Sequence, residues 1–291
     1  MKRLHEFELQ TPLLFLVFNR LDTTKKVFEE IRKAKPKQLF IASDGPRKTK
    51  EDEEKVVEQI RKYVLSNIDW KCNVKTLFRK NNLGCKYAVS SAIDWFFENV
   101  EQGIILEDDC LPSQSFFRFC RELLEKYKDD ERIMQISGTN VEGKTAIKES
   151  YFFTPCFNAW GWATWRRAWK KYDVEMKDWK IFRFSIDFFN IVRNYSLIEK
   201  LKSWRLYQLT YSKKINTWDY QWIFMCLRNK GLCIIPQKNM ITNLGFKIGT
   251  HTTNYRKTEK TLKKFETSFK LNTSPILNRR GYIKIYLKFF K

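Results

Sequence analysis

This sequence lacks the two glycine-rich loops that most often mark a nucleotide site. No GxGxxG follows the first expected strand, and no GxxxxGK[ST] occurs anywhere in the 291 residues. A dinucleotide-binding Rossmann site and a Walker P-loop therefore both lose support. If a nucleotide binds to this chain, it must be held by another set of contacts.

Long uncharged runs are also missing. Residues 9–19 are too few to span a bilayer, and residues 150–165 are interrupted by Pro155, Asn158 and Gly161. We therefore expect no transmembrane helix, no secretory signal peptide and a cytoplasmic protein. The seven cysteines are an odd number without a CxxC pair, so we expect reduced core thiols and no zinc site.

Acidic residues are outnumbered, 33 against 55 lysines and arginines, which gives a formal charge of +22. Such an excess favours an anionic partner: nucleic acid, anionic lipid or a phosphorylated substrate. The most basic part is residues 251–291, with 11 lysines and arginines against Glu259 and Glu266, interleaved with aromatic side chains. We expect this tail to bind an anionic membrane surface; a plain soluble tail is the alternative.

The first 140 residues alternate between strand-like and helix-like patterns. Four apolar runs predict strands: residues 13–18, 38–43, 74–78 and 103–106. Helical periodicity follows each of them: residues 22–34, 51–65, 86–98 and a segment starting near Ser113. Asp22 or Thr23 is expected to cap the first of these helices. Four such units in a row predict an α/β fold with a mostly parallel, doubly wound sheet and helices on both faces.

The predicted strand ends bring polar side chains to one edge of this sheet. They are Asn19, Arg20, Asp44, Asn82, Glu107, Asp108 and Asp109. Ligands of open α/β sheets bind at the carboxyl ends of the strands. Three adjacent carboxylates repel one another there unless a cation or hydrogen-bond donors neutralise them. The alternative is a solvated acidic turn.

From Tyr151 onward the sequence becomes rich in tryptophan: eight of the ten lie between Trp160 and Trp222. Large aromatic rings with a polar edge suit a site that holds a sugar ring. The alternative, that half or more of them belong to the core, remains open. The polar stretch 143–150 suggests a division of the chain near residue 145.

Four segments together resemble GT-A-fold nucleotide-sugar glycosyltransferases, especially bacterial surface-polysaccharide transferases. They are Glu107-Asp108-Asp109, Trp160-Gly161-Trp162, Trp218-Asp219 and Gly249-Thr250-His251-Thr252. Their order is also similar to that of the Golgi N-acetylglucosaminyltransferases that carry a Glu-Asp-Asp motif, and the resemblance covers about residues 12–255. It implies a nucleotide-sugar-binding half at 1–145, an acceptor half of the same domain at 146–255, and a separate tail at 256–291.

The resemblance implies a donor site at the acidic edge. Asp109 would bind Mn²⁺ or Mg²⁺, with His251 as a second metal ligand or a structural residue. Asp108 would face the ribose or metal-bound water, and Glu107 the sugar or the acceptor. The remaining donor contacts would come from Asp44 at the nucleotide base, from Asn19 and Arg20 beside it, and more weakly from Asn82 and Lys86. A turn role for Asp44, before Gly45 and Pro46, is the alternative.

Asp219 is the expected general base. A single displacement at the anomeric carbon needs a carboxylate beside the acceptor hydroxyl, and the family places an inverting base in a matching Trp-Asp pair. A capping role is the alternative for Asp219, and Asp187, Asp178 and Asp173 are substitutes. Four tryptophans are expected to stack on the sugar or the acceptor: Trp160, Trp162, Trp218 and Trp222.

The resulting expectation is an inverting, metal-dependent hexosyl- or N-acetylhexosaminyltransferase that uses a nucleotide sugar, by default a UDP-sugar. It would act on a hydroxyl of a glycan or lipid-linked precursor of lipopolysaccharide or capsule, at the inner face of the cell membrane. No nucleic acid is expected as a partner. A nucleic-acid-associated basic protein and a sugar nucleotidyltransferase are the two alternatives.

Overall fold

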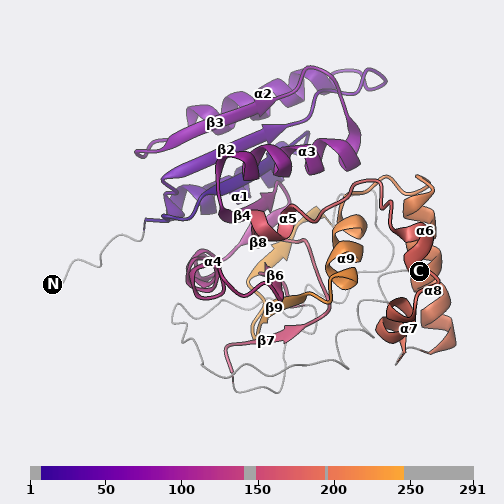
Figure 1. Cartoon of the computed structure of the whole chain (residues 1–291). Helices are drawn as coiled ribbons and strands as arrows, with labels where there is room; N and C mark the ends of the chain where they lie inside the picture. Colours follow the sequence, from indigo (N-terminus) through magenta and orange to yellow (C-terminus); the bar gives the residue numbers. More distant parts are fainter. Residues whose placement is uncertain (1–7, 141–148, 194–195, 246–291) are drawn as a thin grey trace.

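The computed structural model describes residues 8–140, 149–193 and 196–245 (Figure 1). The basic tail, His251 and the expected division near residue 145 lie outside these ranges. The described strands are β1 Leu13–Val17, β2 Gln38–Ser43, β3 Asn73–Phe78, β4 Gln102–Glu107, β5 Cys110–Pro112, β6 Ile133–Ser137, β7 Tyr151–Thr154, β8 Trp162–Trp165, β9 Leu232–Pro236 and β10 Ile241–Asn243. The described helices are α1 Leu21–Ala34, α2 Glu53–Ser66, α3 Gly84–Asn99, α4 Gln114–Lys126, α5 Arg166–Trp169, α6 Trp179–Phe182, α7 Ile186–Val192, α8 Leu197–Tyr211 and α9 Asp219–Arg228.

An eight-stranded sheet with the order β3-β2-β1-β4-β8-β6-β9-β7 organises the described chain. Strands β1 to β4 run parallel, β8 and β7 are antiparallel to their neighbours, and β6 and β9 are parallel to each other. The predicted α/β fold with a mostly parallel sheet is confirmed. Because β8 lies between β4 and β6, both halves of the sequence contribute to one sheet.

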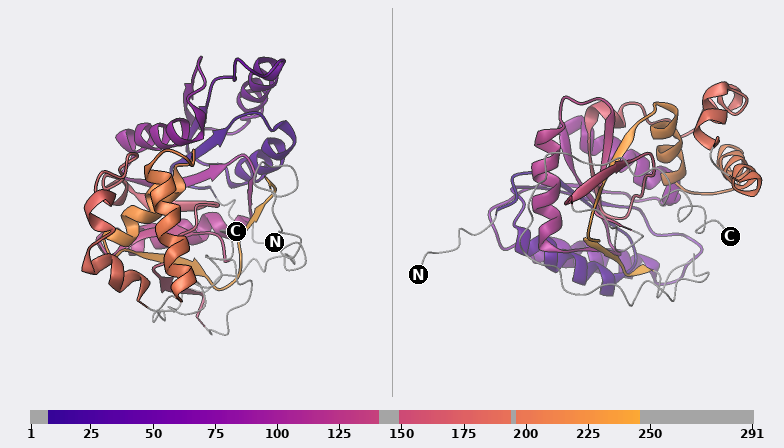
Figure 2. Two further views of the ribbon diagram at one scale, coloured as in Figure 1. Left: turned by 90° about the vertical axis from the view of Figure 1, so that its right-hand side faces the viewer. Right: turned by 90° about the horizontal axis from the view of Figure 1, so that it is seen from below.

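The strands of the first half are buried on both faces, as their continuous apolar sequences predict. In β1, Leu13, Phe15 and Val17 join one core cluster, which includes buried residues of α1, α2 and α4. Leu14 and Leu16 point the other way, into a cluster that includes residues of α3 and α9. The sheet is therefore covered by helices on both faces (Figure 2).

The expected cap of the first helix is wrong. Helix α1 begins at Leu21, one residue before Asp22, and no side chain caps it. The hydroxyls of Thr23 and Thr24 instead donate to the carbonyl of Arg20, at 3.2 and 2.7 Å. Arg20 is therefore the residue at which strand β1 passes into α1, and its side chain starts at the sheet edge.

Three of the tryptophans expected to stack on a ligand belong to the core. Trp162, Trp218 and Trp222 are at most 3% exposed. The Trp162 ring centroid lies 5.7 Å from that of Trp218 and 5.6 Å from that of Trp222. Because these rings pack against one another beneath the surface, the expectation that they contact a sugar is wrong. Trp160 is half-buried and stays a candidate.

The structure also tests the expectation of cysteines in the core and of no transmembrane helix. Five cysteines are buried, namely Cys110, Cys120, Cys156, Cys226 and Cys233, whereas Cys85 is exposed and so departs from the expected core placement. Within the described ranges, every helix is too short or too polar to cross a bilayer.

We predict that Trp162→Ala lowers the free energy of unfolding by about 3–5 kcal/mol, because it removes a fully buried ring from the aromatic cluster. Trp204, which is 36% exposed, provides the matched control: Trp204→Ala should cost less than about 1 kcal/mol. Urea denaturation followed by circular dichroism measures both. Equal stabilities of the two variants would contradict a core role for Trp162.

Candidate functional site

The three acidic residues lie where β4 ends. Glu107 is the last residue of the strand, and Asp108 and Asp109 follow before β5. Burial raises the pKa of Asp108 to about 7. Burial, and then the neighbouring carboxylates, raise the pKa of Glu107 well above its usual range. The solvated acidic turn is therefore wrong, since these carboxyl groups are held away from water and close to one another.

Arg20 supplies the positive charge that this cluster requires. Its guanidinium forms an ion pair with Asp109 and lies 3.4 Å from Asp108 Oδ1. The backbone N–H of Phe18 also donates to Asp108 Oδ2, at 3.2 Å. A positive charge just after β1 thus neutralises negative charge just after the neighbouring strand β4. The sequence placed Arg20 at this edge, but it contained no signal for the ion pair.

The backbone after β10 closes over Asp109. Strand β10 pairs with β5, and the N–H of Leu244 donates to the Asp109 carbonyl at 2.7 Å. A Cβ on Gly245 would lie 2.3 Å from Asp109 Oδ2. Only glycine therefore fits beside this carboxylate without displacing it. Sequence analysis missed Gly245, because a single glycine far from the acidic motif indicates nothing by itself.

Asp44, expected at the nucleotide base, is fully engaged with the start of α3. Its Oδ1 accepts a hydrogen bond from the backbone N–H of Leu83, and its Oδ2 accepts one from the N–H of Gly84, both at 3.0 Å. The Asn82 amide donates to Asp44 Oδ2 at 3.0 Å and to the Gly45 carbonyl at 2.8 Å. Asp44 and Asn82 therefore join the loops after β2 and β3, the structural role left open for Asp44.

Asn19 contacts a buried carboxylate that the sequence did not single out. The Asn19 amide donates to Glu53 Oε1 at 2.8 Å, and the Arg47 backbone N–H donates to Glu53 Oε2 at 2.7 Å. The Arg47 side chain also pairs with Glu53 and lowers its pKa to about 2. These three residues come from three separate segments, so no spacing in the sequence could reveal them.

Asp219, the expected base, is the first residue of α9 and is half-buried. Its carboxylate accepts hydrogen bonds from the Thr217 hydroxyl and from the N–H of Tyr220. Its negative charge is one of the causes of the raised pKa of Glu107. The loop before Asp219 is also held against the start of α3, because the Asn216 amide oxygen accepts a hydrogen bond from the Lys86 N–H at 3.2 Å.

The three substitutes for Asp219 each have a structural partner. Asp173 accepts hydrogen bonds from the backbone N–H groups of Glu175 and Lys177, at 3.0 and 2.7 Å. Asp178 pairs with Arg228 at 2.8 Å, and Asp187 pairs with Lys230 at 3.1 Å. The charge of Asp219, in turn, contributes to the raised pKa of Glu107.

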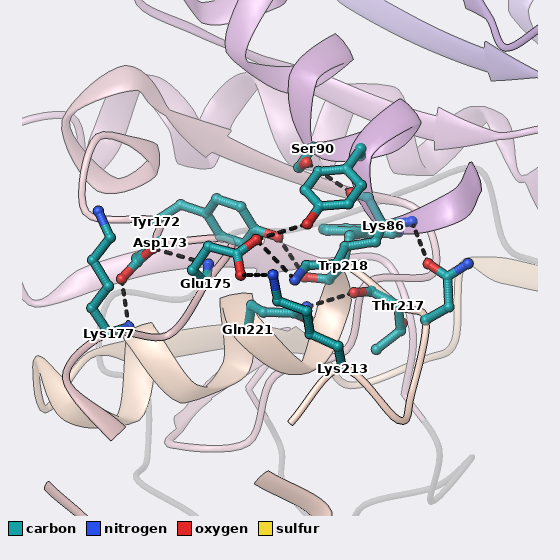
Figure 3. A network of polar contacts seen from close by, with 12 residues as sticks. Lys86, Ser90, Tyr172, Asp173, Glu175, Lys177, Lys213, Thr217, Trp218 and Gln221 are labelled. Carbon is teal, nitrogen blue, oxygen red and sulfur yellow. Dashed lines mark hydrogen bonds and ion pairs between the residues drawn. The ribbon is translucent and has the colours of Figure 1, made fainter. Parts of the chain in front are cut away.

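Lys86 belongs to a network that joins the two halves of the chain (Figure 3). Its buried ammonium lies 3.2 Å from Glu175 Oε1, and the Tyr87 hydroxyl donates to the same oxygen at 2.8 Å. Lys213, from the loop before Asp219, pairs with Glu175 Oε2 at 3.0 Å. The network ties α3 to the loop that carries the candidate base. Glu175 is a further residue that no pattern in the sequence singles out.

Few side chains at this edge of the sheet could serve as metal ligands. Among the residues described, no group of three or more histidine, cysteine or acidic side chains is arranged to hold a metal ion. The charged groups closest to Asp109 include the Glu107 and Asp108 carboxylates and the Arg20 guanidinium. Any ion held there would need oxygen ligands from another molecule.

We predict that Glu175→Gln lowers the free energy of unfolding by about 1–3 kcal/mol, because it leaves the buried Lys86 ammonium without its carboxylate. Lys213, Tyr87 and Lys86 lower the pKa of Glu175 to about 2. The stabilising effect is therefore present above the unfolded pKa near 4 and is lost as the pH falls through about 2. Urea titrations of wild type and variant between pH 2 and 7 measure this difference; one that does not shrink in acid contradicts the assignment.

Comparison with known proteins does not assign this chain to a family. No protein-family model matches it, and no curated protein matches it by sequence. Solved structures with a similar fold include HddC from Yersinia pseudotuberculosis, with 9% identity and a TM-score of 0.32 over 54% of this chain and 78% of that one. A UDP-glucose pyrophosphorylase complexed with UDP-glucose has 11% identity and a TM-score of 0.39, over 81% and 94% of the two chains. Mouse xyloside xylosyltransferase 1 in its apo form has 11% identity and a TM-score of 0.36, over 76% and 82%. These values are too low to transfer any of the three activities to this chain.

Proposed function

We propose that this protein is a glycosyltransferase that transfers a sugar from a nucleotide diphosphate sugar to an acceptor hydroxyl with inversion. One observation carries the proposal: Glu107 to Asp109 lie at the carboxyl end of β4, and the Asn216 hydrogen bond to Lys86 holds the loop before Asp219 at the start of α3, where Asp44 of the same edge is also bound. This edge is where open α/β sheets bind ligands. Direct transfer needs positive charge at the donor diphosphate, which a carboxylate-bound cation would supply, and a carboxylate base at the acceptor hydroxyl.

The residues present fit a divalent cation at Asp109. Carboxylate oxygens are the ligands that Mn²⁺ and Mg²⁺ prefer, and Gly245 leaves open the position beside Asp109 Oδ2 that a Cβ would fill. Asp109 and Asp108 would hold the ion, and phosphate oxygens of the donor and water would complete its ligands. When bound, the ion would balance the charge of the departing diphosphate. His251 remains part of this proposal as a further ligand.

Arg20 has two roles in the proposed mechanism. Without donor, its guanidinium balances the charge of Asp108 and Asp109. With donor, the same group is available to phosphate oxygens, which match the planar fork of a guanidinium. Its side chain is 38% exposed, so the donor can reach it from solvent. Asn19, Asp44, Asn82 and Lys86 would border the nucleotide by shaping the loops around this edge.

Asp219 would accept the proton of the acceptor hydroxyl as the new bond forms. Its position at the start of α9, with the Thr217 hydroxyl and the Tyr220 N–H as donors, fixes the carboxylate in one orientation. The Glu175 network holds the preceding loop against α3. Asp219 is half-buried, so part of the residue reaches solvent. A single base opposite the leaving group permits one displacement, and hence inversion.

We predict that Asp109→Asn reduces Mn²⁺-dependent affinity for UDP at least about ten-fold, because it removes a charged metal ligand. Isothermal titration calorimetry with UDP, with and without Mn²⁺, measures the effect. Asp69→Asn is the matched control, since Asp69 pairs with Arg32 on the exposed surface. Full Mn²⁺-dependent UDP affinity in Asp109→Asn would rule out the metal assignment.

We predict that Asp219→Asn lowers kcat by roughly 10²–10⁴ while donor affinity stays the same, because the amide keeps the shape but cannot take up a proton. Release of nucleotide in the presence of acceptor measures the rate, and NMR of the product gives its anomeric configuration. Asp187→Asn, on α7, is the control and should leave kcat unchanged. Normal turnover in Asp219→Asn, or a retained configuration, would refute this mechanism. Formation of pyrophosphate from a nucleoside triphosphate and a sugar 1-phosphate, supplied in a separate assay, would favour a sugar nucleotidyltransferase.

A further inference from the structure

Helices α6, α7 and α8 and the turn after α6 expose large apolar side chains to solvent. The exposed set, called here the apolar face, consists of Ile181, Phe184, Ile186, Phe189, Leu197, Ile198 and Leu201, which are 60–81% exposed. In the remainder of the described chain, no other large apolar residue is more than 46% exposed. Exposed large apolar side chains gathered on neighbouring helices mark an interaction site.

These side chains are not needed for internal packing. The inner sides of the same helices already form a core with α9, which includes Trp179, Phe182, Phe188, Tyr207 and Phe224. In α8 the buried residues are Ser203, Leu206, Tyr207 and Thr210, whereas Leu197, Ile198 and Leu201 lie on its outer side. A helix that is apolar on both sides is expected to be covered on both sides.

The apolar face stands at the margin of the molecule. Figure 1 shows α6, α7 and α8 grouped beyond α9, and the right-hand view of Figure 2 shows α7 and α8 projecting from the sheet and its covering helices. The main contacts of this group with other described elements are with α9, and Pro155 and Phe157 after β7 line a cavity together with its inner side. A flat partner could therefore reach the face without meeting the rest of the protein.

Basic residues are interspersed with the residues of the apolar face along the sequence. Between residues 180 and 205 they are Lys180, Arg183, Arg193, Lys200, Lys202 and Arg205. The two acidic residues of the segment are already engaged. Asp187 pairs with Lys230 at 3.1 Å, and Glu199 accepts a hydrogen bond from the Ser196 N–H at 2.8 Å as part of a capping box. The partner of this face must offer apolar contact and negative charge together.

Two other occupants conflict with this charge. A second copy of the chain would bring the same basic side chains against each other, because a symmetric interface pairs a patch with itself. The tail of this chain, residues 251–291, carries 11 lysines and arginines against two glutamates and would also be repelled. An anionic bilayer offers an apolar interior beneath negative headgroups and satisfies both requirements.

We propose that the apolar face of α6, α7 and α8 binds the surface of an anionic lipid bilayer. The side chains of the face would enter the boundary between headgroups and acyl chains, and the interspersed lysines and arginines would contact the lipid phosphates. This proposal is independent of the chemistry proposed for the site. It assigns membrane binding to a folded surface, whereas the sequence suggested the basic tail for that role.

Flotation of the full-length protein with vesicles tests the proposal. The vesicles are pure phosphatidylcholine or phosphatidylcholine mixed with phosphatidylglycerol. We expect binding to the anionic vesicles, and a decrease of at least about ten-fold in the partition coefficient for Phe184→Ser/Leu197→Gln/Leu201→Gln, which removes exposed apolar area. A second variant, Lys202→Gln/Arg205→Gln, should lose most of the preference for anionic over neutral vesicles.

Two controls separate surface chemistry from misfolding. Leu197→Met/Leu201→Met keeps the face apolar and should bind vesicles like the wild type. Leu65→Gln, on α2, changes a leucine that is 41% exposed away from the face and should also bind normally. Thermal unfolding of every variant should stay close to that of the wild type, since the substituted side chains are solvent-exposed.

Three results would overturn the proposal. One is unchanged vesicle binding by the triple variant, with binding lost instead on deletion of residues 276–291. Another is equal wild-type binding to neutral and anionic vesicles. The third is a dimer in lipid-free solution, detected by sedimentation velocity, that becomes a monomer in the triple variant. That last result would assign the face to self-association.

Discussion

The mutual repulsion of three consecutive carboxyl groups at the end of a buried strand is the constraint on which this structure depends. Burial raises the pKa of Glu107 and Asp108, so the cluster is stable only with compensating contacts. The segment between β1 and α1 supplies the Phe18 N–H and the Arg20 guanidinium. The chain after β10 supplies close backbone contact at Gly245. Segments from both ends of the described chain therefore converge on β4.

The first half of the fold was predictable because its signals are local. Apolar runs separated by amphipathic helices specify parallel β-α units. The predicted strand at residues 38–43 coincides with β2, and the helix predicted at 86–98 lies within α3. The polar edge followed from the same reasoning, since parallel strands end on the same side. The resemblance to a known family added the hypothesis for Asp219, which no local pattern contains.

What could not be predicted depends on contacts between distant residues. Trp162 and Trp222 pack together although 60 positions separate them in the chain, so a stretch rich in tryptophan looked like a ligand site. The role of Glu175 could not be predicted, because its partners come from α3 and from the loop before α9. The apolar face was hidden for the opposite reason. Leu197 and Leu201 have the spacing of core residues, and only the fold shows that they point outward.

The position of β8 affects how the chain can fold during synthesis. β8 pairs with both β4 and β6, and it begins at Trp162. Until that segment leaves the ribosome, the completely buried Ile104 and Ile105 of β4 lie on an open strand edge, and β6 has no partner from earlier in the chain. Such edges template aggregation. A nascent chain of about half the final length would thus depend on chaperones, and a fragment ending before Trp162 would be a poor choice for expression.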